Sequence, residues 1–112
     1  MYTTVGSING LPVSFLVDTG ATTIAMNVVD ARRLAVNYRF KGVEARVSTA
    51  SGLAKAYRVS LDKVTVGEIS LRNVKAVVID GLFPKQVLLG MSFLGQLEIQ
   101  RSAGMMQLKQ NL

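Results

Sequence analysis

This 112-residue chain contains only some of the side-chain types that commonly take part in catalysis or metal binding. The sequence contains no cysteine and no histidine, which excludes thiol nucleophiles, thiolate- or imidazole-bound metals and Ser-His-Asp triads. We therefore expect no metal and no other cofactor, and any hydrolytic chemistry would use carboxylates, hydroxyls or lysines. The acidic residues number seven: Asp18, Asp30, Asp62, Asp80, Glu44, Glu68 and Glu98.

Asp18 differs from the other acids in its local sequence. The run 15–21 reads Phe-Leu-Val-Asp-Thr-Gly-Ala, so an apolar strand leads directly into a carboxylate that is followed by small residues. A carboxylate at the end of a buried strand must be hydrogen-bonded to be stable. Gly20 permits a tight turn that brings backbone N–H groups close to Asp18, and Thr19 offers a hydroxyl that can reach a neighbouring strand or chain. The alternative interpretation is an Asp that caps a strand-to-helix turn.

The elements that must position Asp18 are mostly strands. Runs of β-branched and aromatic residues between turn residues predict strands over 2–8, 11–17, 43–48, 54–66, 69–79 and 87–89, and a closing hairpin over 97–108 that turns at Ala103-Gly104. Asn9-Gly10 is a hairpin-turn dipeptide, so the first two strands pair. A helix capped by Asn27 is expected over 28–35, and one or two helical turns over 91–97.

The chain is expected to form one domain over residues 1–112. Its length is typical of one compact core, and 49% of its residues are hydrophobic. Short strands with glycine at the turns predict an all-β barrel or sandwich that carries small helices.

The net charge of +6 would be compatible with binding to a nucleic acid or an anionic membrane. The distribution of the charged residues does not favour such binding. Only Arg32 and Arg33 are adjacent, and the other cations are spread along the chain, as on an ordinary solvated surface. No apolar run is long enough to span a membrane, and no signal segment is present. We expect a soluble domain without nucleic-acid or membrane contact. A domain cut from a membrane-anchored precursor would look the same and would then be periplasmic.

Three parts of the sequence together resemble a known family, the aspartic proteases. The run 15–21 is similar to their catalytic loop. The run 87–94, Val-Leu-Leu-Gly-Met-Ser-Phe-Leu, is similar to their second signature, and 48–56, with Gly52, lies where they carry a β-hairpin flap. The resemblance spans essentially the whole chain. Within the family, the sequence looks more specifically like the bacterial, single-domain retropepsin-like proteases.

The resemblance implies a closed acid-protease barrel with one or two short helices, and aspartic endopeptidase activity on peptides or proteins. It implies a catalytic role for Asp18, supporting roles for Thr19, Gly20, Ala21 and Gly90, and a substrate-binding flap at Ser51 and Gly52. Taken alone, Ser51-Gly52 fits a simple hairpin turn better than a substrate contact. The mechanism needs two carboxylates that share one proton, and the chain has a single Asp-Thr-Gly, so the resemblance implies a homodimer.

The sequence also departs from the retroviral members of this family. They place an acidic residue after Asp-Thr-Gly-Ala and Arg after the second signature's Gly, and these groups brace the dimer. This chain has Thr22, Thr23 and Met91 at those places, so a weak dimer is expected. The alternative function is a catalytically silent module of the same fold that binds peptides or dimerises.

Overall fold

The computed structural model describes residues 2–49, 52–102 and 105–110. Its strands are β1 (Tyr2–Ile8), β2 (Leu11–Val17), β3 (Ile24–Asn27), β4 (Val43–Thr49), β5 (Gly52–Val66), β6 (Ile69–Ile79), β7 (Val87–Leu89), β8 (Leu97–Ser102) and β9 (Met105–Gln110). Its helices are α1 (Val28–Arg33), α2 (Tyr38–Lys41) and α3 (Met91–Leu94).

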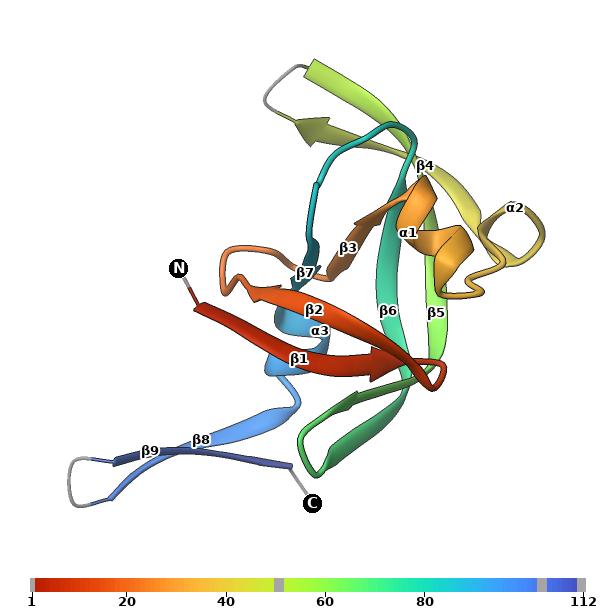
Figure 1. Cartoon of the computed structure of the whole chain (residues 1–112). Helices are drawn as coiled ribbons and strands as arrows, with labels where there is room; N and C mark the ends of the chain where they lie inside the picture. The colour runs from red at the N-terminus through yellow and green to blue at the C-terminus, as the bar shows by residue number, and fades with distance from the viewer. Residues whose placement is uncertain (1, 50–51, 103–104, 111–112) are drawn as a thin grey trace.

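Six strands close into a barrel (Figure 1). They pair in the order β1-β2-β7-β3-β6-β5, and β1 returns to β5, where Ser7 pairs with Thr65. β2–β7 and β3–β6 are parallel, whereas β1–β2 and β5–β6 are antiparallel. Closure of the sheet is what removes open edges from a small β domain, and it confirms the expected fold.

The barrel interior is filled by alternate residues of its strands. Phe15 and Ile8 from the first hairpin, Met26 from β3 and Phe93 from α3 are each at most 1% exposed. Side chains on the two faces of a strand alternate, so the period-two pattern of the sequence directs one set of residues inward. Ala31 of α1 and Phe93 and Leu94 of α3 are buried in the same core.

The long strands β5 and β6 bend partway along their length, so each contributes core residues on both sides of its bend. Leu61 and Val74 are paired and buried, and Val64 is buried after two exposed positions. The intervening Asp62 and Asn73 are exposed, and Asn73 has a φ of +54°, a left-handed conformation that Asn tolerates better than most residues. The bend changes which strand positions face the core.

β4 lies outside the barrel and pairs only with β5 among the described strands. The β4–β5 hairpin rises above the barrel in Figure 1 and corresponds to the flap expected from the sequence. At its base, the rings of Tyr38 in α2 and Tyr57 in β5 pack with centroids 5.1 Å apart. This contact holds the base of the flap against the body of the domain.

Most predicted elements are confirmed. Asn9 (φ +52°) and Gly10 (φ +80°) form the first turn with the positive φ values that tight hairpins need. Asn27 caps α1 by accepting the Asp30 N–H at 2.8 Å, but the helix ends at Arg33 rather than residue 35.

Two elements were not predicted, β3 and α2. Each has four residues, too few for a periodic pattern to appear, and the described helices number three instead of the expected one or two. The predicted turn at Ala103-Gly104 lies outside the described residues, although the strands on either side of it are present. No helix in the described part of the chain is long and apolar enough to cross a membrane.

Candidate active site

Asp18 lies at the point where β2 leaves the barrel and turns toward β3. Its N–H donates to the Leu89 carbonyl of β7 at 3.1 Å, and its carbonyl accepts the Ala21 N–H at 3.2 Å. The carboxylate Oδ1 accepts the Gly20 N–H at 2.9 Å, as the small residues after Asp18 predict. The half-buried carboxylate is therefore held in a fixed loop.

The second apolar-Gly signature lies directly against this loop. The Met91 N–H donates to the Ala21 carbonyl at 2.8 Å. A Cβ on Gly90 would overlap the Thr23 carbonyl and would lie 2.8 Å from the Ala21 carbonyl oxygen. Only glycine lets β7 pass so close to the Asp18 loop. The structure thus brings together Asp18, Gly20, Ala21 and Gly90, which sequence reasoning placed in one site.

Thr19 is exposed, and its hydroxyl has no hydrogen-bond partner within the part of the chain that the structure describes. In the same part, no other carboxylate is hydrogen-bonded to Asp18. Asp30 and Glu44 form ion pairs elsewhere, with Arg33 and Lys55. One copy of the chain thus presents a single carboxylate at this loop.

Ser92 is a supporting residue that the sequence analysis missed. Its Oγ accepts the Ile24 N–H at 3.0 Å and donates to the Lys75 carbonyl at 2.6 Å. One hydroxyl therefore ties α3 to the start of β3 and to β6. A serine in the otherwise apolar helix 91–94 was the available signal.

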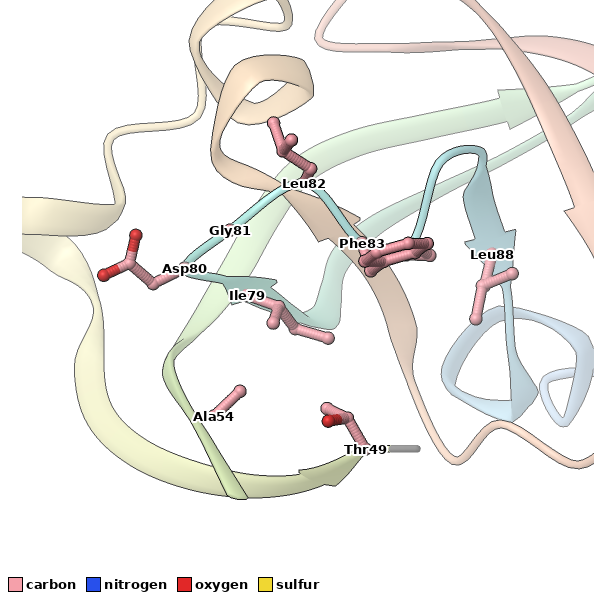
Figure 2. A pocket seen from close by; sticks show the side chains of 9 residues that line it. Thr49, Ala54, Ile79, Asp80, Gly81, Leu82, Phe83 and Leu88 are labelled. Atoms are coloured by element: carbon pink, nitrogen blue, oxygen red, sulfur yellow. The ribbon is translucent and has the colours of Figure 1, made fainter. Parts of the chain in front are cut away.

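An apolar cavity of about 480 Å³ lies between the flap and the loop after β6 (Figure 2). Its lining is mostly apolar side chains from four segments: Ala54, Ile79, Leu82, Phe83, Pro84 and Leu88, with Thr49, Asp80 and Gly81. In Figure 2 the Asp80 carboxylate points away from Phe83 and Leu88. Leu88 belongs to β7 and pairs with Leu16 of β2, so the cavity lies on the barrel elements that carry the Asp18 loop.

Asn27 connects the cavity loop to the barrel. This buried side chain caps α1 through its oxygen and donates from Nδ2 to the Pro84 carbonyl at 2.8 Å. The sequence predicted the cap but not the second bond, because the loop 81–85 approaches β3 only in the folded chain.

The flap residues expected to contact substrate are only partly described. Ser51 lies outside the described residues. Gly52 is exposed at the start of β5, with a φ of +114°, and the Thr49 hydroxyl donates to its carbonyl at 2.7 Å. Thr49 and Ala54 are the described flap residues that line the cavity.

Residues 4–96 match the family described as "gag-polyprotein putative aspartyl protease". The chain belongs to this aspartyl protease family. The match includes the Asp18 loop, the flap and the Gly90 signature.

One curated protein is similar to most of this chain. An uncharacterized protein encoded in the cobV 5' region of Sinorhizobium sp. is 38% identical over 98 residues, which are 88% of this chain and 42% of that protein. The chain therefore spans less than half the length of this curated relative.

Two solved structures share the fold. The retropepsin-like aspartic protease from Rickettsia conorii superposes with a TM-score of 0.76 and 28% identity, covering 94% of this chain and 87% of that one. The EIAV protease, in complex with the inhibitor HBY-793, superposes with a TM-score of 0.65 and 22% identity, covering 84% of this chain and 85% of that one. These likenesses make the barrel retropepsin-like.

Proposed function

We propose that this aspartyl protease family member is an active endopeptidase that works as a homodimer, with one Asp18 from each copy. The observation that carries the proposal is the fixed loop around Asp18, in which Gly20 binds the carboxylate and β7 packs beneath. The Gly20 bond alone would also suit an Asp that caps the turn, but β7 and α3 are packed directly against this loop through Gly90 and the Met91 N–H, and Asp18 forms no ion pair within the described residues.

Two-fold symmetry would supply the second carboxylate that the reaction needs. Two carboxyls in contact share one proton, because two negative charges side by side repel each other. The ionised group takes a proton from a water molecule as the water oxygen bonds to the scissile carbonyl carbon, and the protonated group gives its proton to the carbonyl oxygen. As the C–N bond breaks, the carboxyl that took the proton from water gives it to the leaving nitrogen, and the other carboxylate takes a proton back from a hydroxyl of the tetrahedral intermediate. The exposed Thr19 hydroxyl is free to bond across the axis.

The substrate in this proposal is an extended peptide held under the flaps. Backbone hydrogen bonds to strand edges would hold its main chain. The cavity beside Phe83 and Leu88 would accept one apolar side chain near the cleaved bond, since its lining is mostly apolar. About 480 Å³ is enough for a large aliphatic or aromatic side chain.

The direct test is replacement of Asp18 by Asn, which keeps the size of the side chain and removes its acid–base function. We expect Asp18→Asn to abolish cleavage of an unfolded protein at acidic pH while the far-UV circular dichroism is unchanged. Asp62→Asn, the same change at an exposed carboxylate on the bend of β5, is the matched control and should cleave normally.

Two results would contradict the proposal. Cleavage by Asp18→Asn equal to that of the native chain would place the chemistry elsewhere. A native chain that dimerises and binds a peptide transition-state mimic such as pepstatin, but cleaves nothing, would instead indicate a non-catalytic peptide-binding module.

A further inference from the structure

The short helix α2 presents an aromatic side chain to the solvent. Phe40 is 89% exposed, the highest value among the large apolar side chains of the described residues. It lies between two exposed cations, Arg39 and Lys41, and Val43 at the start of β4 is 67% exposed. Exposed apolar groups that gather within a polar rim mark binding surfaces.

The exposure of Phe40 follows from how α2 is held. Tyr38 is buried and packs on Tyr57, and the Gly42 N–H donates to the Tyr38 carbonyl at 2.9 Å. A Cβ on Gly42 would overlap that carbonyl and would lie 3.0 Å from the Tyr57 Cβ. Residues two apart in a helix point about 200° from each other, so this turn cannot bury Phe40 while Tyr38 stays in the core.

The charge around Phe40 is positive and largely uncompensated. The sequence 31–43 has no acid, and its cations are Arg32, Arg33, Arg39 and Lys41. The acids on either side of this segment are engaged elsewhere, since Asp30 pairs with Arg33 at 3.6 Å. Glu44 pairs with Lys55 at 3.8 Å. The other three cations of the segment form no ion pair within the part of the chain that the structure describes.

Folding brings these cations together around Phe40. Arg32, at the end of α1, lines the same surface pocket as Arg39 and Phe40. Lys41 borders a neighbouring small cavity with Asp62, which is exposed and forms no ion pair within the described residues. Because Arg32 and Arg39 are not adjacent in the sequence, the spread of cations along the chain did not favour an anionic partner. We call Arg32, Arg39, Phe40 and Lys41 the α2 surface.

We propose that the α2 surface binds an anionic lipid bilayer. Its cations would contact lipid phosphate and carboxylate groups, and the Phe40 ring would enter the boundary between headgroups and acyl chains. An acidic peptide would satisfy the cations but leave the Phe40 ring in water. A single-stranded nucleic acid would need a longer basic groove with several stacking rings.

The α2 surface is separate from the candidate active site. In Figure 1 α2 lies on the right and the turn after β2, which carries Asp18, lies on the left. A domain bound through α2 would therefore keep the Asp18 loop away from the bilayer. Lipid binding of this kind does not depend on peptidase activity, and either property can be present without the other.

A fluorescent side chain at position 40 tests the proposal directly, because the chain has no tryptophan. The emission of Phe40→Trp should shift to shorter wavelength with vesicles of phosphatidylcholine that contain about one-third phosphatidylserine. It should not shift with phosphatidylcholine alone. Phe83→Trp is the matched control, since Phe83 is also exposed (63%) and also has a lysine near its ring, Lys85 at 5.8 Å. Its emission should not shift with either kind of vesicle.

Co-sedimentation of the full chain with the same vesicles measures the separate contributions of charge and ring. Arg39→Gln should lower the partition coefficient about fivefold, and Phe40→Ser about tenfold. Arg72→Gln removes an exposed cation of β6 and should lower it less than about twofold. Far-UV circular dichroism checks that each variant is folded.

Three results would overturn the lipid proposal. The first is a native chain that does not bind the anionic vesicles, or that binds them as well after Arg39→Gln and Phe40→Ser. The second is an equal emission shift at positions 40 and 83. The third is a shift of Phe40→Trp by poly-glutamate as large as that by the vesicles, which would identify an acidic protein as the partner.

Discussion

At the scale of single residues, the site depends on two glycines that do different things. Gly90 is required by packing, because a Cβ there would overlap the backbone of Thr23. Gly20 has room for a Cβ except toward the Asp18 carboxylate, whose Oδ1 would lie 3.2 Å away. Gly90 therefore allows β7 to pack against the Asp18 loop, whereas Gly20 leaves space for the Asp18 carboxylate.

Alanine substitutions at Gly90 and Gly20 should distinguish an effect on stability from an effect on catalysis. Gly90→Ala should lower the free energy of unfolding by about 3 kcal/mol, because the backbone carbonyls of Ala21 and Thr23 must move. Gly20→Ala should change it by less than about 1 kcal/mol but lower kcat/KM about tenfold by displacing the Asp18 carboxylate. Urea unfolding and peptide cleavage measure the two effects. Equal stability of the two variants would show that β7 has more room than this packing implies.

At the scale of elements, the site lies where β2, β3, β7 and α3 meet. Backbone bonds join β2 to β7 and α3 to the Asp18 loop. The Ser92 hydroxyl is the side-chain link, since it satisfies one backbone group of β3 and one of β6. These elements are far apart in sequence, so their relative position depends on a few such bonds.

Removal of this link should weaken the whole barrel. Ser92→Ala leaves the Ile24 N–H and the Lys75 carbonyl without this partner, which should cost about 1–3 kcal/mol in the free energy of unfolding. Ser60→Ala is the matched control. Ser60 is exposed and lies opposite Lys75 across the β5–β6 ladder, so its loss should change stability by less than about 0.5 kcal/mol. Chemical denaturation measures both, and a Ser92→Ala variant as stable as the control would refute the role of the hydroxyl.

At the scale of the whole molecule, the described barrel carries one Asp-Thr-Gly loop and one β4–β5 flap, which borders the apolar cavity at Phe83 and Leu88. In the proposed mechanism, the two-carboxylate site would be shared between two copies. Thr22, Thr23 and Met91, next to the Asp18 loop and Gly90, are uncharged and cannot form ion pairs across an interface. An interface without such charge-assisted bonds relies on apolar burial and strand pairing.

We therefore expect a dimer that is weak and an activity that depends on concentration. The specific activity should fall on dilution from micromolar to nanomolar protein, because each active site needs two chains. Sedimentation at the same concentrations should show the dimer dissociating in parallel. A dimer that persists at nanomolar concentration, or a specific activity independent of dilution, would contradict this expectation.

The strands were predictable because their alternation is local. β1 and β2, with the Asn9-Gly10 turn, and the long strands β5 and β6 agree with the sequence almost residue by residue. β3 and α2 were not predictable, because four residues carry no period and their conformation depends on neighbours. The Ser92 hydrogen bonds and the second Asn27 hydrogen bond could not be predicted for the same reason, because their partner groups come from distant segments.

The sequence by itself determined the kind of chemistry this chain can perform. Without His or Cys, hydrolytic chemistry would have to use carboxylates, hydroxyls or lysines, and the apolar run before Asp18, with the small residues after it, singled out one acid. The tertiary structure decided which distant segments surround that acid: β7 beneath it, and the flap and loop 81–85 around an apolar cavity. Local sequence specifies backbone conformation and side-chain chemistry, whereas proximity between distant segments arises only when the barrel closes and buries its core.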